Sequence, residues 1–214
     1  MAITLEALEQ LDQQLTLAIN SWHSTFSDPI MWFFSDKKVW IPMYALIIAL
    51  MFWKLGWKRT LVVLAGVSLT VLFCDQFANL IKHYFQRIRP VNDPYMVENG
   101  LHILEHGGGF SFFSAHAANS FGVALCTIIP VMKFGASRHM LPDSGYSDVK
   151  PALWAKIYTA WMVIWAFMVS ISRIFVGKHF LGDVIVGIAV GICFGLIMGW
   201  ICTWCIRKLN RAAV

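Results

Sequence analysis

The stretch SRIFVGKHFLGDVIVGIAVGICFGLIMGWICTWCIR, residues 172–207, joins a polar cluster to a long apolar run. Its beginning carries Arg173, Lys178, His179 and Asp183, and no charged residue then follows until Arg207. An uncharged helix needs about 20 residues to cross the hydrocarbon core of a bilayer, and this run is long enough. The stretch therefore predicts a transmembrane helix with ionisable residues gathered at its start.

The composition extends this interpretation to the whole chain. Of the 214 residues, 58% are hydrophobic and only 14% are charged, which is typical of an integral membrane protein. The net charge of +5 is scattered around the predicted helix ends, without the aromatic-interleaved basic patch that would indicate nucleic-acid binding. All five cysteines lie in apolar stretches, which argues against a disulfide framework or a zinc site. We expect one membrane domain over residues 1–214.

Five runs are long and apolar enough to span the membrane: 38–56, 58–85, 114–134, 152–175 and 179–207. They are continuous and too long for the alternation of β-barrel strands, so the expected fold is an all-α integral membrane protein with about five transmembrane helices over 38–207. The loop 86–111 is the long polar connection, with prolines and a Gly107–Gly109 run.

The N-terminal segment 1–36 carries too many acidic residues to span easily. Apolar residues nevertheless recur at helical spacing, at Leu5, Leu8, Leu11, Leu15 and Ile19. This pattern predicts an amphipathic helix lying on the membrane surface, followed by a second short segment near Asp28–Pro29.

The positive charges predict the orientation. One membrane face would hold ten of the Lys and Arg residues: Lys54, Lys58, Arg59, Lys133, Arg138, Lys150, Lys156, Arg207, Lys208 and Arg211. The opposite face would hold Lys37, Lys38, Lys82, Arg87, Arg89, Arg173 and Lys178. Because cytoplasmic loops are enriched in Lys and Arg, the first face is predicted to be cytoplasmic and the cluster at 172–183 to face outward.

Four predicted helix ends meet at that outward face. The second span ends near Lys82 and Arg89, the third begins at Ser114-Ala115-His116, the fourth ends at Arg173, and the fifth begins with His179 and Asp183. Ionisable groups at membrane depth are costly and indicate a functional site. Arg and Lys together with hydroxyl and backbone donors suit the oxygens of a phosphate group.

The spacings indicate chemistry. His179 and Asp183 are four residues apart at a helix start, so the carboxylate can accept a proton from one ring nitrogen and leave the other free to attack. Lys82 and Arg89 are two helical turns apart and can point the same way before Pro90 ends the helix. His116, just inside the next helix, could protonate a departing oxygen as general acid.

The motifs resemble the three signatures of the type 2 phosphatidic acid phosphatases, a membrane family that shares its site with vanadium haloperoxidases. The matching residues are Lys82-x6-Arg89-Pro90, Ser114-Ala115-His116 and Ser172-Arg173-x5-His179-x3-Asp183, and the resemblance covers about residue 58 to the C-terminus. The second signature departs from the family's Pro-Ser-Gly-His, since this chain reads Phe113-Ser114-Ala115-His116. Three ordered motifs are far more specific than any one alone.

The resemblance implies a role for each matching residue. His179 would form a phosphohistidine, Asp183 would orient it, and His116 would protonate the leaving group and then activate water. The phosphoryl oxygens would be held by Lys82, Arg89, Arg173, Ser114 and the amide of Ala115. It implies no metal and no other cofactor, because fixed cations take the electrostatic role of Mg²⁺.

Three functions compete on this evidence. The first is a lipid phosphatase of the bacterial inner membrane with an outward-facing site. The second is a phosphotransferase that uses a polyprenyl diphosphate donor and shares the same intermediate. The third is a phosphate or anion transporter, against which the charges all lie at one face rather than at the midplane.

The substrate would be a lipid phosphate drawn from the bilayer, with no required protein partner. The candidates are lipid A phosphates, undecaprenyl diphosphate and phosphatidylglycerol phosphate. The aromatic-rich stretch FSFFSAHAANSFG, residues 110–122, favours the lipid A phosphatases.

Other polar residues near the site have plainer interpretations. Single interfacial residues such as His83, His102, His106, Arg87 and Lys178 are expected to snorkel or cap helices. Asp75 could face the site, or it could form a structural hydrogen bond to Asn79 or to a neighbouring helix.

Overall fold

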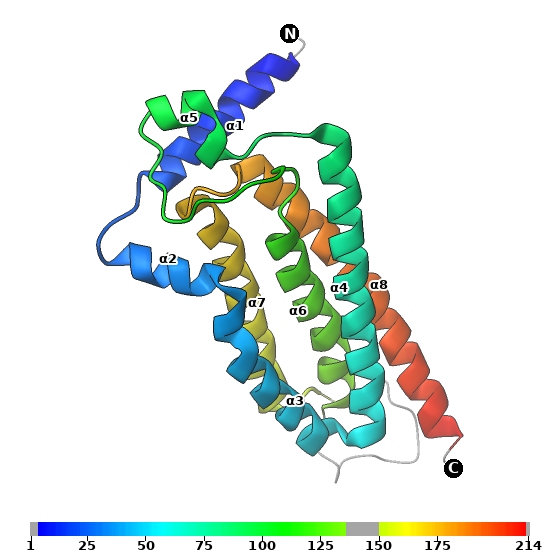
Figure 1. Cartoon of the computed structure of the whole chain (residues 1–214). Coiled ribbons are helices and arrows are strands. Elements are labelled where there is room, and N and C mark those ends of the chain that lie inside the picture. The colour runs from blue at the N-terminus through cyan, green and yellow to red at the C-terminus, as the bar shows by residue number, and fades with distance from the viewer. Residues whose placement is uncertain (1–3, 136–149, 213–214) are drawn as a thin grey trace.

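The computed structural model describes residues 4–135 and 150–212, and these contain helices and no strand (Figure 1). The helices are α1 (Leu5–Asn20), α2 (Ser27–Ser35), α3 (Ile41–Leu55), α4 (Trp57–Phe85), α5 (Pro94–Glu98), α6 (Ala115–Phe134), α7 (Leu153–Phe175) and α8 (Leu181–Arg211). Short 3-10 turns lie at Lys37–Trp40 and Pro90–Asn92. Five segments, containing α3, α4, α6, α7 and α8, are long and apolar enough to cross a membrane. The predicted all-α fold with five spans is therefore confirmed, each helix end lying within about one turn of its predicted position.

Helix α6 is the centre of the bundle, since it packs against α4, α7 and α8. Its contact with α8 is close because glycines recur every fourth residue along α8. A Cβ atom on Gly191 would lie 2.3 Å from the carbonyl oxygen of Ala118, and one on Gly187 would lie 2.5 Å from that of Ser114. Small residues at such positions let helix backbones approach in a membrane. The approach places the beginnings of α6 and α8 side by side, where the Ser114 amide donates to the Asp183 carbonyl at 3.0 Å.

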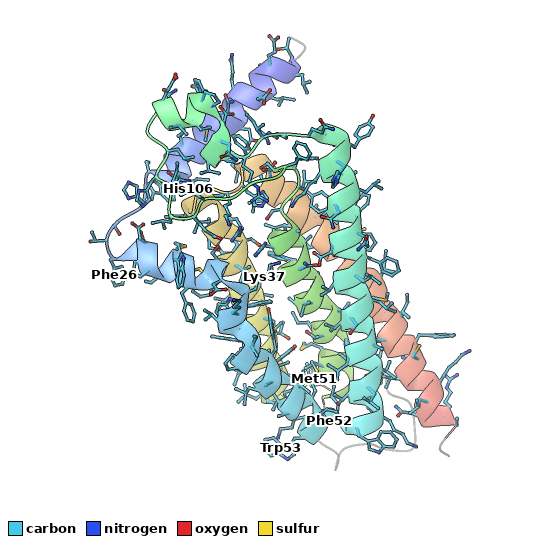
Figure 2. The ribbon with its side chains drawn as sticks, viewed as in Figure 1. Phe26, Lys37, Met51, Phe52, Trp53 and His106 are labelled. Atoms are coloured by element: carbon cyan, nitrogen blue, oxygen red, sulfur yellow. The ribbon has the colours of Figure 1, made fainter. Side chains whose placement is uncertain are left out.

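The four helix ends that carry the motifs lie together at one end of the bundle, as their positions in the sequence predict (Figure 1). Helix α4 ends at Gln86, which takes a left-handed conformation with φ 47°, and α7 ends before the turn at Gly177 with φ 79°. The long loop after α4 packs on this turn, because the Val91 amide donates to the Gly177 carbonyl at 3.1 Å. The opposite end of the bundle carries the cations that the sequence assigns to the other face, except Arg138, which lies outside the described residues. In Figure 2, Trp53 marks that end and His106 the end of the site.

Helix α1 binds the bundle through its polar side. Asp12, Thr16 and Asn20 follow one another at helical spacing and face the junction of α7 and α8. Thr16 Oγ1 accepts from the Leu181 amide at 2.9 Å and Asp12 Oδ1 from the Gly182 amide at 2.7 Å, while Asn20 Nδ2 donates to the carbonyls of Ile174 and Phe175 at 3.0 and 3.2 Å. The amides of Leu181 and Gly182 belong to the first turn of α8, which has no partners for them inside the helix.

The apolar side of α1 faces away from the protein. Four of the leucines of α1 are more than 40% exposed: Leu5, Leu8, Leu11 and Leu15. A surface of this kind suits contact with lipid, and the membrane-surface position of residues 1–36 remains a prediction. The second segment, α2, begins at Ser27, next to the predicted break.

Candidate active site

A polar cavity lies at the end of the bundle that carries the motifs, and two of the predicted site residues, His116 and Arg173, line it. It has a volume of about 420 Å³, and its lining includes Ser35, Lys37, Glu105, His116, Arg173 and Lys178. The residues come from α2 and the turn after it, the long loop, α6 and the α7–α8 junction. Three cations, Lys37, Arg173 and Lys178, share this lining with two carboxylates, Asp36 and Glu105, so a small excess of positive charge suits the cavity to an anion.

His179 and Asp183 form a buried pair beside this cavity, with only 2% and 0% of their surfaces exposed. His179 Nδ1 lies 3.4 Å from Asp183 Oδ2, and that oxygen also accepts from the Phe180 amide at 3.0 Å. The Ser111 hydroxyl donates to the same oxygen. Nδ1 is therefore the protonated nitrogen, and Nε2 keeps its lone pair with no partner among the described residues. This is the arrangement that the spacing of His179 and Asp183 predicts for a nucleophile.

The surroundings keep His179 neutral near pH 7. Burial lowers the pKa of His179 to about 4, and the nearby charges of Arg173 and Arg89 lower it as well, while the hydrogen bond and the charge of Asp183 oppose this shift. A neutral imidazole with a free Nε2 can attack an electrophile over the whole physiological pH range.

Two arginine side chains hold donors without acceptors. The Nε atoms of Arg89 and Arg173 are buried and lack a hydrogen-bond partner within residues 4–135 and 150–212. The other end of Arg173 is fixed, because its Nη1 donates to the backbone carbonyl and the hydroxyl of Ser35. Lys82 lies within electrostatic range of Arg89, Arg173 and Asp183. Buried guanidinium donors without acceptors suit the oxygens of a phosphoryl group.

The second signature begins α6. Ser114 is the N-cap: its hydroxyl accepts from the Ala117 amide at 3.4 Å, and its side chain is fully buried. Its O–H can still donate, although it does not line the cavity. The Ala115 amide is among the first donors of the helix, which have no partner inside it. Ala115 does not have a positive φ, so the substitution for Gly in this signature needs no strained backbone.

His116 connects the polar cavity to a second one. The second cavity has a volume of about 410 Å³ and extends between α3, α4, α6 and α7. Its walls are mostly apolar, with Ile47, Met51, Val67, Met162 and Val169 among them. Three residues, Ser35, Lys37 and His116, line both cavities, so the two meet at the proposed general acid.

The structure adds functional candidates that the sequence interpretation missed. Arg87, expected to snorkel, lies inside the site: Nη1 is 3.0 Å from Asp183 Oδ1 and Nη2 is 2.8 Å from Asp12 Oδ2. Its guanidinium also lies 3.8 Å from the ring centre of Phe180. Its position between Lys82 and Arg89 in the first signature was a signal for this role. Nothing in the sequence marked Asp12 or Ser111.

Lys178, also expected to snorkel, pairs with Glu105 at the polar cavity. Glu105 Oε2 also lies 3.8 Å from Arg173 Nη1 and accepts from the Ser35 hydroxyl at 3.2 Å. Burial acts to raise the pKa of Glu105, but the hydrogen bond from Lys178 and the charge of Arg173 together hold it below its ordinary value. Glu105 is thus an ionised carboxylate that limits the positive charge of the cavity.

One group of side chains outside the site, His23, Asp28 and His102, has the residue types of a metal site. The two imidazole rings are stacked, however, with centroids 3.7 Å apart and planes 7° from parallel. Imidazole donates its lone pair in the ring plane, and two parallel planes do not meet at one ion. His102 instead pairs with Asp28 at 3.0 Å, and the group contains none of the predicted site residues.

Comparison with known proteins gives consistent matches. The model of the PAP2 superfamily matches residues 59–211. A lipid A 4'-phosphatase from Bacteroides thetaiotaomicron is 34% identical over 186 residues, which cover 86% of this chain and 73% of that protein. A lipid A 4'-phosphatase from Porphyromonas gingivalis is 28% identical over 187 residues, covering 86% of this chain and 70% of that protein.

Two solved structures share the fold at 20% sequence identity. One is a transmembrane PAP2-type phosphatidylglycerolphosphate phosphatase from Bacillus subtilis, with a TM-score of 0.65 over 96% of this chain and 89% of that one. The other is LpxE from Aquifex aeolicus, with a TM-score of 0.58 over 86% of this chain and 92% of that one.

Proposed function

Because the chain belongs to the PAP2 superfamily and is a multi-pass membrane lipid phosphatase, we propose that its substrate is a phosphate ester of lipid A in the bacterial inner membrane. The two relatives named as lipid A 4'-phosphatases match most of the chain and support this choice. Undecaprenyl diphosphate and phosphatidylglycerol phosphate are the next candidates.

The observation that carries the proposal is the meeting of two unlike cavities at His116. The cationic cavity of about 420 Å³ suits a phosphorylated head group, and the apolar cavity of about 410 Å³ suits the beginning of an acyl chain. An amphiphile can occupy both at once, with its phosphate ester next to His116. A free phosphate ion would not occupy the apolar cavity.

The first chemical step would be attack by Nε2 of His179 on phosphorus. The P–N bond forms as the bond to the lipid oxygen breaks, and His116 gives that oxygen a proton. Asp183 accepts the Nδ1 hydrogen bond and stabilises the positive charge that develops on the ring, as the acid does in a Ser-His-Asp triad. The charges of Lys82, Arg89 and Arg173, with the hydroxyl of Ser114 and the amide of Ala115, would stabilise the phosphoryl oxygens.

The second step would be hydrolysis of the phosphohistidine. His116, now neutral, takes a proton from water as the water oxygen attacks phosphorus, and the P–N bond breaks to regenerate His179. Each step needs only protein side chains and water. The fixed cations would take the electrostatic role of a metal ion, so we propose that the reaction is independent of metal.

The charge distribution supports an outward-facing site. Ten of the Lys and Arg residues belong to the face opposite the motifs, and three of the remaining seven, Lys82, Arg89 and Arg173, are proposed phosphate ligands. The positive-inside rule then places the site on the periplasmic or external side. Such a site would act on lipids that have already crossed the inner membrane.

The test is phosphate release by the purified protein from the three candidate lipids, with and without EDTA. We expect hydrolysis of lipid A phosphate at the highest kcat/KM, unchanged by EDTA. The His179→Ala variant is the matched control for contaminating phosphatases. Loss of activity in EDTA would contradict the metal-free mechanism, and preference for undecaprenyl diphosphate would contradict the substrate.

A further inference from the structure

The apolar cavity contains polar groups that its own walls do not satisfy. Asp75 of α4 and Asn119 of α6 both line it, and Asn119 Nδ2 donates to Asp75 Oδ1 at 2.7 Å. This leaves Asn119 Oδ1 buried with no donor among the described residues. Trp165 of α7 lines the same cavity with 3% of its surface exposed, and its Nε1 donor is buried without an acceptor.

A hydrocarbon chain alone would not suit this arrangement. A buried donor or acceptor without a partner destabilises the protein, and a purely apolar ligand would leave these groups unpaired. The cavity thus offers an acceptor at Asn119, a carboxylate at Asp75 and a donor at Trp165. A ligand group that both donates and accepts hydrogen bonds would satisfy them, and a hydroxyl or a secondary amide does both.

The depth of these groups along their helices tells which part of a lipid they would meet. Asn119 lies about 4.5 Å from His116 along α6, since a helix rises about 1.5 Å per residue. By the same rise, Asp75 lies about 10 Å from Lys82 along α4 and Trp165 about 12 Å from Arg173 along α7. The polar groups therefore lie about 4.5 to 12 Å deeper in the bundle than the proposed phosphate-site residues, in the region that the first part of an acyl chain would occupy.

We infer that Asp75, Asn119 and Trp165 form a subsite for a hydroxyl or amide group on the first part of the substrate's acyl chain. The inference rests on the proposed function and narrows its substrate class to phosphorylated lipids whose chains are joined through amides or carry hydroxyls near the head group. Diacylglycerol phosphates offer only ester oxygens in this region, which accept but do not donate. Polyprenyl diphosphates offer neither.

The experiment compares two synthetic substrates that differ in one feature. The first is a phosphorylated glucosamine carrying 3-hydroxytetradecanoyl chains, and the second is the same molecule with tetradecanoyl chains. We expect the wild-type protein to hydrolyse the hydroxylated lipid with a kcat/KM about tenfold higher or more, the typical effect of one satisfied buried hydrogen bond. A ratio near one, with both lipids hydrolysed, would overturn the subsite and leave the proposed function intact.

Two variants test the residues, each with a matched control on the outer surface of the bundle. Asn119→Leu removes the acceptor with little change in size, Trp165→Phe removes the donor while keeping an aromatic ring, and each should reduce the ratio at least threefold. Asn79→Leu and Trp200→Phe make the same exchanges at exposed positions and should keep the wild-type ratio. A high ratio that neither site variant changes would also overturn the subsite. The wild-type ratio decides the question even if a variant does not fold. Failure to hydrolyse either lipid would contradict the proposed function, and the subsite with it.

Discussion

Replacing Arg87 tests whether the proposed catalytic carboxylate, Asp183, depends on a cation to which the family resemblance assigns no role. Arg87 joins Asp183 Oδ1 at 3.0 Å to Asp12 Oδ2 at 2.8 Å, and Asp183 is fully buried. In Arg87→Gln, Asp183 would keep its contacts with Ser111 and the Phe180 amide but lose its only ion pair with an arginine among the described residues.

The expected loss of activity in Arg87→Gln follows from the burial of its ion pair with Asp183. Removing one partner of a fully buried pair costs about 3–5 kcal/mol. The Arg87 side chain is 20% exposed, so water can compensate in part, and we take about 2 kcal/mol as the loss. If the transition state is destabilised by this free energy relative to the free enzyme and substrate, kcat/KM decreases roughly 30-fold. Arg87→Lys should recover only part of it, because an ammonium cannot bridge both carboxylates as the planar guanidinium does.

The assay is phosphate release as a function of pH, because a merely structural role would not move the pH profile. In the wild type, activity should fall on the acid side only as His179 protonates, near its lowered pKa of about 4. Without Arg87 the charge of Asp183 is less compensated and raises the pKa of His179, so activity is lost at a higher pH. The variant should therefore lose proportionally more activity at pH 5 than at pH 7.5.

The control is Arg207→Gln, which removes an exposed cation at the other end of α8 and should leave the profile unchanged. Wild-type kcat/KM in Arg87→Gln, together with an unmoved acid limb, would refute the reasoning. A folded variant with reduced activity but no shift in pH dependence would limit Arg87 to a structural role.

Four further predictions concern the nucleophile, the general acid, the orientation and the helix packing. His179→Ala should abolish both phosphate release and labelling by a phosphate-labelled substrate, and substantial residual activity would exclude this nucleophile. His116→Ala should remain active on an aryl phosphate, whose leaving group needs no proton, while losing about 100-fold or more on lipid phosphates; equal losses on both would make His116 a phosphate ligand. In a protein without other cysteines, Gly108→Cys should react with an impermeant maleimide on intact spheroplasts and Ala212→Cys should not, and the reverse pattern would invert the predicted orientation. Gly191→Leu should destabilise the protein by roughly 3 kcal/mol, because its side chain would collide with the α6 backbone; an unchanged melting temperature in detergent would mean that α8 can shift at little cost.

The sequence was sufficient to predict the spans and the meeting of the motifs at one end of the bundle because both depend on local signals. An apolar run bounded by charges fixes where a helix enters the membrane to within about a turn, and the motifs stand at those ends. The pairing of His179 with Asp183 needs only helical spacing, which does not depend on the rest of the fold. The all-α membrane fold followed from these features, and the family from the resemblance of the three motifs to its signatures.

The remaining contacts could not be predicted because they join segments far apart in the chain. Arg87 and Lys178 have the same local surroundings as residues that merely snorkel, and only the folded loop shows that they face Asp183 and Glu105. Asp75 had two interpretations, and the structure shows a bond to a neighbouring helix, through Asn119, while Asp75 also lines the apolar cavity that meets the site. The packing of the α8 glycines against the backbone of α6 was likewise not predicted from the sequence.

Both sides of the amphipathic helix α1 matter for its position: the apolar side and the polar side contact different surroundings. The exposed leucines predicted a helix on the membrane surface, and they face away from the protein. The opposite, polar side forms specific hydrogen bonds with the bundle. Asp12, Thr16 and Asn20 pair with backbone groups at the start of α8 and the end of α7, the two helices that carry His179 between them. Since Asp12 also holds Arg87 against Asp183, the position of the nucleophile depends on a helix that none of the three signatures includes. If the apolar side of α1 contacts lipid, its polar side would link the position of this helix at the membrane surface to the turn that carries His179. The geometry of the phosphate site would then depend on how α1 lies on the membrane.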